Sequence, residues 1–195
     1  MAFYLLKSDF QRYITDTNLD GITEADDSAW QKMLSSVIET VSSYMRFRYD
    51  TDKEFVLTEH VLADTYVAGD TVVDSDKFYI ASQDVPATTP ITNTAFWTES
   101  DFRNQAMIDV VLVFVLYGIY SRINGSEIPN WIQVLYDGGD SQQRGGKLGY
   151  LKEIRKGTVQ TTIPLLSDVA DGTTQSGNSF AHGSAVGAVT RNTSI

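Results

Sequence analysis

The fold of this chain is decided by residues 28–49, which read SAWQKMLSSVIETVSSYMRFRY. Apolar side chains recur there at the i, i+3, i+4, i+7 spacing of an amphipathic helix, at Trp30, Met33, Leu34, Val37, Ile38, Val41, Tyr44 and Met45. A helix with one apolar face must bury that face, so the pattern requires a partner. The longest apolar run, residues 110–120, is shorter than the roughly 20 residues that cross a bilayer, and we expect it to be a buried helix.

Further helices are indicated on both sides of these two. Residues 102–123 form the long central helix, a short helix precedes residue 15, and two more follow residue 128. The expected first residues or caps are Ser8, Asp101 and Pro129, and the last helix is marked by Leu148, Leu151 and Ile154. The predicted fold is mainly α: a helical bundle with a small antiparallel β insertion and an extended C-terminal arm.

The insertion is predicted at residues 51–100, which lack a helical period. Turn residues separate its short strand-like runs, which lie at 55–57, 65–67, 71–73 and 78–81. About fifty residues of short strands bury little apolar surface, so the insertion must pack on a helix or on another chain. We therefore expect a helical core from 1–50 and 101–166, a β insertion at 51–100 and an arm at 167–195.

Composition excludes several kinds of chemistry. The 195 residues contain no cysteine, which removes disulfides, thiolate zinc sites and cysteine nucleophiles. The net charge is −10 and is uneven, with 18 acids and 7 bases in residues 1–101. Such a chain is a poor non-specific ligand for DNA. One segment is locally basic, and it either contacts phosphate or meets an acidic neighbour: Arg144, Lys147, Lys152, Arg155 and Lys156.

One segment has the spacing of a calcium-binding loop. Oxygen-bearing positions fall at Asp16, Asn18, Asp20, Ile22, Glu24 and Asp27, with Gly21 at the sixth place. Asp27 stands where a longer Glu is usual. The alternative is a tight turn in which Gly21 adopts a positive φ and Asp26 or Asp27 caps the next helix. No other cofactor is expected.

No catalytic arrangement is visible in the sequence. The two histidines, His60 and His182, lie 122 positions apart without a carboxylate or hydroxyl at a catalytic spacing, and we expect both at the surface. No glycine-rich phosphate loop follows a strand. We therefore expect a protein that is not an enzyme.

The C-terminal arm points to partners. Residues 167–195 are rich in Gly, Ser and Thr and contain one aromatic residue, so they cannot bury enough apolar surface on their own. We expect neighbouring subunits to hold them. The predicted contact residues are Phe180 in the arm and Ala68, Gly69, Asp70, Pro86 and Pro90 in the turns of the insertion.

Residues 3–49 and 102–166 resemble phage head-to-tail connector proteins, also called adaptor, neck or head-completion proteins. The shared features are a short first helix, an Asp/Gly-rich turn, the Arg46-Phe-Arg48-Tyr49 element after a long helix, and an apolar helix with Tyr117, Tyr120 and Arg122 near its end. The resemblance implies a structural virion protein, assembled in the host cytoplasm. It would form a ring of about twelve copies between the portal and the tail, through which DNA passes without sequence-specific contact and without a membrane.

The insertion is similar to small chitin- or cellulose-binding modules. The similarity rests on Tyr66, Gly69, Asp70, Val72, Phe78, Tyr79, Ala81, Pro90 and Trp97. It implies a compact β fold with Tyr79 and Trp97 as its minimal core. The alternative function is therefore a carbohydrate-binding virion accessory, which would present Tyr66, Tyr79 or Trp97 as an exposed row of rings.

Overall fold

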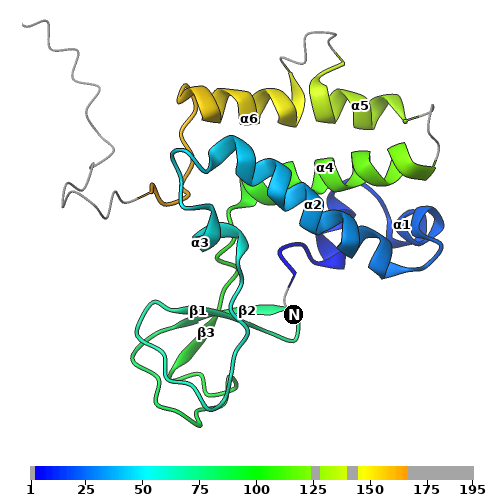
Figure 1. The fold of residues 1–195 in the computed structure, drawn as a ribbon. Helices are drawn as coiled ribbons and strands as arrows, with labels where there is room; N and C mark the ends of the chain where they lie inside the picture. Colours follow the sequence, from blue (N-terminus) through cyan, green and yellow to red (C-terminus); the bar gives the residue numbers. More distant parts are fainter. Residues whose placement is uncertain (1–2, 124–127, 140–144, 167–195) are drawn as a thin grey trace, which may run out of the picture.

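The computed structural model describes residues 3–123, 128–139 and 145–166 (Figure 1). Its elements are the 3-10 helix η1 (Lys7–Arg12), α1 (Asp16–Thr23), α2 (Asp27–Met45), α3 (Thr51–Phe55), β1 (Thr71–Asp74), β2 (Lys77–Ala81), β3 (Trp97–Glu99), α4 (Gln105–Ile123), α5 (Asn130–Asp137) and α6 (Gly146–Lys156). A mainly helical fold with a small antiparallel sheet is thus confirmed. The predicted arm at 167–195 lies outside the described residues.

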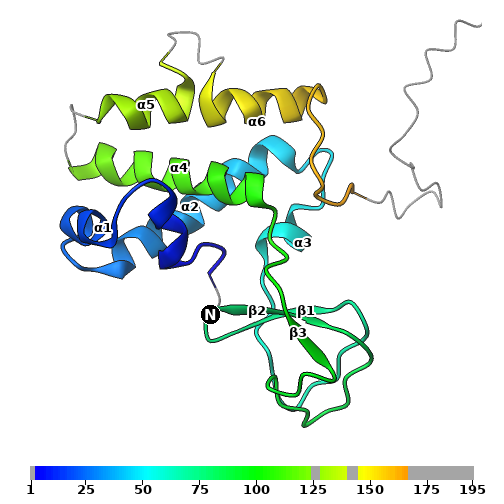
Figure 2. The same cartoon turned by 180° about the vertical axis from the view of Figure 1, so that it is seen from behind.

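Helix α4 is the centre of the bundle. It packs against α2, α5 and α6, and on its other side against α1 and η1 (Figures 1 and 2). The segment Gln105–Arg122 is long and apolar enough to cross a membrane, whereas residues 110–120 alone are too short. More than half of that window is buried by the other helices, and a bundle's core helix has this character.

Helices α2 and α4 are in contact where Met33 lies against Gly118. A Cβ atom at this position would lie 2.7 Å from the Met33 sulfur, inside van der Waals contact. The end of the Met33 side chain occupies this space, so the apolar face of α2, predicted from residues 28–49, packs on α4. The core that results joins side chains from before and after the insertion, including Leu34, Val41, Leu112 and Leu151.

The predicted caps of two helices are wrong. The central helix begins at Gln105, because the Asn104 side chain accepts hydrogen bonds from the backbone N–H of Ala106 and Met107. Asp101 binds Arg103 instead. At the start of η1, the Asp9 carboxylate accepts a hydrogen bond from the Leu6 N–H. The capping side chain is therefore Asp9 and not Ser8.

The insertion begins later than predicted. Residues 51–55, expected in the β insertion, form helix α3, whose N-terminus is capped by Asp50. Phe55 is buried and packs edge-on against the Tyr4 ring, with ring centroids 4.9 Å apart. Helix α3 therefore packs on the bundle through Phe55 and is not part of the β insertion.

The remaining residues of the insertion, 56–100, form the β module. Its sheet has the antiparallel order β1-β2-β3, and a turn with positive φ at Ser75 and Asp76 joins β1 to β2. The predicted strands at 71–73 and 78–81 are confirmed. The runs at 55–57 and 65–67 are not strands, and the short β3 was not predicted. The module projects from one side of the bundle, beyond α3 (Figures 1 and 2).

Candidate functional site

The calcium-loop prediction is wrong in its geometry. Asp16, Asn18 and Asp20 lie on helix α1, where residues two apart point about 200° away from each other and cannot converge on one ion. Within the described residues there is no group of three or more acidic or histidine side chains that could hold a metal. The positive φ angles belong to Glu24 and Ala25, so Gly21 does not supply the turn.

The carboxylates of this segment have other partners. Asp26 caps α2 by accepting a hydrogen bond of 2.9 Å from the Ser28 N–H, as the alternative interpretation predicted. Hydrogen bonds from Ser28 lower the pKa of Asp26, so this carboxylate is ionised at neutral pH. Lys7 lies 2.8 Å from Asp20 and 3.2 Å from Asp27. We call Asp16, Asp20, Glu24, Asp26 and Asp27 the acidic surface.

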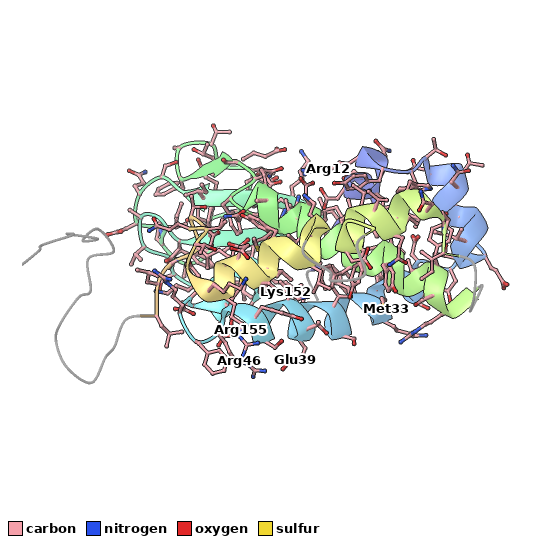
Figure 3. The ribbon with its side chains drawn as sticks, turned by 90° about the horizontal axis from the view of Figure 1, so that it is seen from above. Arg12, Met33, Glu39, Arg46, Lys152 and Arg155 are labelled. Carbon is pink, nitrogen blue, oxygen red and sulfur yellow. The ribbon has the colours of Figure 1, made fainter. Side chains whose placement is uncertain are left out.

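The opposite charge gathers where α2 and α6 end. The basic–aromatic surface consists of Arg46, Phe47, Arg48, Lys152, Arg155 and Lys156; Figure 3 shows three of these bases on one side of the bundle. Phe47 is 77% exposed, and the Arg155 guanidinium lies 5.9 Å from the centroid of its ring. The distance is at the outer limit of a cation–π contact, which contributes about 0.5–1 kcal/mol at an exposed site, so most of the Phe47 ring stays open to solvent.

The predicted basic segment is divided by the structure. Lys152, Arg155 and Lys156 belong to the basic–aromatic surface, whereas Lys147 faces Asp109 at 3.8 Å. Arg144 lies outside the described residues. Sequence reasoning missed that Arg46 and Arg48 join these bases, because more than a hundred residues separate the two segments. The available signal was the Arg-Phe-Arg triplet at a helix end, which exposes an aromatic side chain between two bases.

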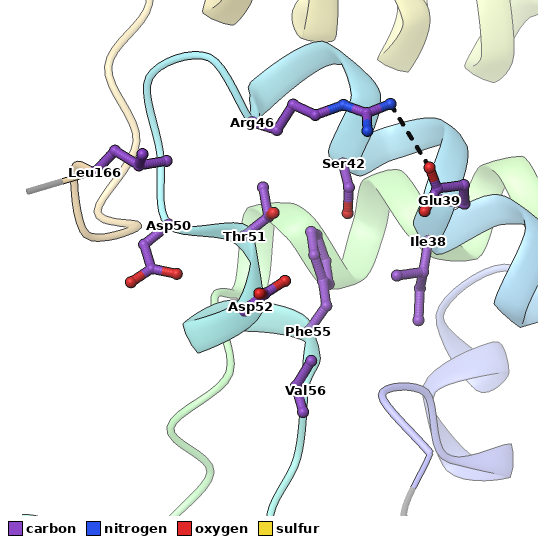
Figure 4. A pocket seen from close by; sticks show the side chains of 10 residues that line it. All are labelled: Ile38, Glu39, Ser42, Arg46, Asp50, Thr51, Asp52, Phe55, Val56 and Leu166. Atoms are coloured by element: carbon purple, nitrogen blue, oxygen red, sulfur yellow. Dashed lines mark ion pairs between the residues drawn. The ribbon is translucent and has the colours of Figure 1, made fainter.

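A groove of about 660 Å³ adjoins this surface and shares Arg46 with it (Figure 4). Its apolar lining includes Phe55, Val56 and Leu166, of which Val56 is 67% and Leu166 51% exposed. Charged side chains line the rest of the groove. Glu39 lies 3.6 Å from Arg46, and Asp50 and Asp52 lie on the α3 side. The groove is therefore an open, partly apolar depression rather than an enclosed catalytic pocket.

A buried ionic joint fixes the β module to the bundle. The Arg103 guanidinium lies 2.7 Å from Asp9 and 2.8 Å from Asp101, and it donates to the Tyr4 carbonyl. Its flat face lies over the Phe78 ring of β2, 4.2 Å from the centroid. One side chain thus links η1, the segment before α4 and the module.

Glu54 lies next to this joint. Its carboxylate accepts hydrogen bonds from the Tyr4 hydroxyl and, at 3.0 Å, from the Asn104 N–H. Burial raises the pKa of Glu54, while these hydrogen bonds act in the opposite direction. The hydrogen bonds tie the end of α3 to the start of α4, and Glu54 also lines a second depression of about 640 Å³, together with Arg103 and Tyr150.

The β module buries the rings that sugar binding would need. Trp97 is 2% and Tyr66 9% exposed, and the two rings meet edge to face at 5.2 Å. His60 is partly buried and stacks on Tyr66, so it is less exposed than predicted; His182 lies outside the described residues. The predicted exposed row of rings is therefore missing from the described part of the module. Trp97 belongs to the module core as predicted, with Tyr79 packed against it.

The predicted contact turns lie on the outside of the module. Ala68, Gly69, Pro86 and Pro90 are exposed and Asp70 is partly so; the neighbouring apolar side chains Val61, Leu62 and Val67 are exposed as well. These turns are available to a partner, and their role stays a prediction. Phe180 lies outside the described residues.

The candidate functional features among the described residues include the acidic surface, the basic–aromatic surface, the groove beside Arg46 and the depression beside Glu54. Their assignment rests on the residues themselves. Comparisons with protein-family models, curated proteins and solved structures gave no match for this chain.

Proposed function

We propose that this chain is a structural subunit of a phage virion. In this role, copies form a ring that joins the portal to the tail, and DNA passes through the ring. The observation that carries the proposal is the number of large apolar side chains left exposed on separate parts of the described chain: Phe47, Val56, Val61, Leu62, Val67, Trp131, Val134 and Leu166. Apolar side chains that are exposed singly are ordinary, but adjacent ones such as Val61 and Leu62 support contact with another chain.

The arrangement of the chain supports the same role. The two blocks of sequence that resemble connector proteins pack together into one core, and the inserted module projects from it (Figure 1). A projecting module with exposed apolar turns is suited to reach a second protein. The net charge of −10 disfavours tight binding of DNA. A passage through which DNA moves must not bind it tightly.

The test is assembly. The purified full-length chain, alone and mixed with the portal protein of the same phage, is examined by mass photometry and electron cryo-microscopy. We expect a ring on the portal; twelve copies of a 21.6 kDa chain would weigh about 260 kDa. A chain that stays monomeric at high concentration and never joins the portal would contradict the proposal.

Removing the arm sharpens this test. A chain ending at Leu166 retains the whole bundle core and the β module, so we expect an unchanged far-UV circular dichroism melting curve. We expect weaker assembly, because the arm is proposed to lie on neighbouring subunits. Equal assembly by the shortened and full-length chains would remove the arm from the contact.

A further inference from the structure

The depression beside Glu54 lies next to α3, which stands between the bundle and the β module in Figure 1. Its volume of about 640 Å³ is within the range of small-molecule sites, roughly 300–1,000 Å³. Its lining comes from α3, the start of β1, residues 102–106, helix α6 and residues 160–164. All of these segments belong to one chain, so assembly is not needed to complete the depression.

An anionic ligand finds no free donor on Arg103. The five N–H groups of this guanidinium donate to Asp9, to Asp101 and to the Tyr4 carbonyl. The other cation in the lining, Lys53, is already in an ion pair with an aspartate. The depression therefore lacks the unused guanidinium that best recognises a phosphate or a carboxylate.

A cationic ligand is disfavoured as well. Among the described residues that line the depression, Glu54 supplies the single carboxylate, whereas Lys53 and Arg103 are both positively charged. These two charges repel another cation that comes close to Glu54. The lining therefore favours a ligand without net charge.

Several polar side chains of the lining can still form hydrogen bonds. Both hydrogen bonds to Glu54 end on its Oε1 atom, so Oε2 is able to accept another. Within the described part of the chain, no hydrogen bond uses the side chains of Thr71, Tyr150 or Gln160. The Thr162 hydroxyl accepts one hydrogen bond and keeps its own hydrogen for donation. Donors and acceptors are thus both present.

These groups match the chemistry of a saccharide. The Gln160 amide and the hydroxyl groups can each donate and accept, as every sugar hydroxyl can, and Glu54 adds a strong acceptor. Tyr150 and Phe102 add partly exposed rings to the lining, on which the C–H face of a sugar can pack. A flat aromatic ligand would use these rings but leave most of the polar groups unpaired.

We infer that the depression beside Glu54 binds an uncharged saccharide. Glu54 and Gln160 hold the hydroxyl groups at the edge of a sugar ring, and Tyr150 contacts its face. This site lies beside the β module and not in its core, where Tyr66 and Trp97 are buried. The inference goes beyond the proposed ring and does not rest on it.

The test is ligand-observed saturation-transfer NMR on the full-length chain, which works for a monomer and for a ring. The probes are cellobiose, lactose, maltose and N,N′-diacetylchitobiose, each at up to about 20 mM, so that millimolar dissociation constants are detected. We expect saturation transfer to the C–H protons of at least one probe. Absence of transfer to all of them would overturn the inference.

Two substitutions locate the site. Gln160→Ala removes an exposed amide and should weaken sugar binding about fivefold, as expected for the loss of one hydrogen bond. Tyr150→Leu removes the ring and the hydroxyl together and should weaken binding further, with circular dichroism as the check on folding. The matched control, Gln83→Ala, changes an exposed glutamine of the β module outside the depression and should bind as the unchanged chain does. Unchanged binding by Gln160→Ala would mean that the sugar binds elsewhere.

Competition tests the chemical class of the ligand. Inorganic phosphate and adenosine are added to the complex of the chain with its best disaccharide, and neither should displace the sugar. Displacement by phosphate would show that the depression binds anions, and displacement by adenosine would show that it prefers flat rings; either result contradicts the inference. Assembly on the portal is measured separately, so a chain that binds sugar but forms no ring removes only the proposed function.

Discussion

The core of the helical bundle contains many buried apolar side chains from two distant parts of the sequence. The core of the β module contains five buried side chains: Tyr66, Val72, Ala81, Val85 and Trp97. A core that small gives little stability by itself. The module compensates through Arg103, which places its guanidinium on Phe78 and its charge against Asp9 of the bundle. We therefore expect the module to depend on the bundle for part of its stability.

The largest effect is expected from breaking the joint. Arg103→Met leaves the Asp9 carboxylate buried without its cation, and loss of one partner of a buried ion pair costs about 3–5 kcal/mol. Urea unfolding followed by far-UV circular dichroism measures the loss. The matched control is Lys77→Met, which removes an exposed ion pair to Glu99 and should leave the midpoint unchanged. Equal midpoints for the two variants would show that the joint contributes nothing.

A cavity in the bundle comes next. Leu112 of α4 is fully buried at the centre of the bundle, and Leu112→Ala removes three carbon atoms from a site that α4's neighbours cannot readily fill. We expect a loss of about 3 kcal/mol in the free energy of unfolding. The exposed Val61→Ala in the module is the control and should change stability by less than about 0.5 kcal/mol. A small effect at Leu112 would mean that α4 is not the structural centre.

The same contrast explains how much the sequence predicts. The centre of the bundle was predictable because α2 repeats apolar residues with a 3.6-residue period over 19 residues, and because α4 contains a long apolar run. Helix α3 and strand β3 were missed because each has only three to five residues, and Phe55 and Trp97 are fixed by tertiary packing rather than by a local pattern. Asp101 was predicted as a cap because the sequence does not reveal that Arg103 binds it.

The candidate surfaces were only partly predictable for a similar reason. Lys152, Arg155 and Lys156 stand close together in the sequence, so their shared charge is visible. Arg46 and Phe47 join them only because α2 and α6 end side by side in the fold. The acidic residues of α1 were recognised as a cluster, but their spacing also fits a metal loop, and only the helix excludes that geometry.

A modest effect is expected inside the module. Trp97 fills the small core, yet its buried Nε1 atom has no hydrogen-bond partner among the residues that the structure describes. Trp97→Phe therefore loses ring volume but also removes an unsatisfied donor, and the two changes partly cancel. We expect a loss of about 1 kcal/mol, measured as faster amide hydrogen exchange in β1 and β2. Exchange in α4 should not change; faster exchange there would mean that the module and the bundle unfold together.

The smallest effect concerns pH. Because the pKa of Glu54 in the folded chain lies above the 4.5 of an ordinary glutamate, the folded chain holds this proton more tightly than the unfolded chain does. The contribution of Glu54 to stability is therefore present below pH 4.5 and declines as the pH rises through its raised pKa. Glu54→Gln keeps an acceptor for the Tyr4 hydroxyl and the Asn104 N–H but cannot ionise.

The urea midpoints of the unchanged chain and of Glu54→Gln are measured at several pH values above 4.5. We expect the unchanged chain to lose stability relative to Glu54→Gln across this range, and the difference to level off once Glu54 is ionised in the folded state. Asp101 does not interfere, because its pKa is lowered from 3.8 and its effect falls below this window. Parallel curves would show that burial does not perturb Glu54. Since Glu54 lies beside the Arg103 joint, parallel curves would also mean that water reaches the joint, and the dependence of the module on the bundle would then be weaker than the buried ion pair implies.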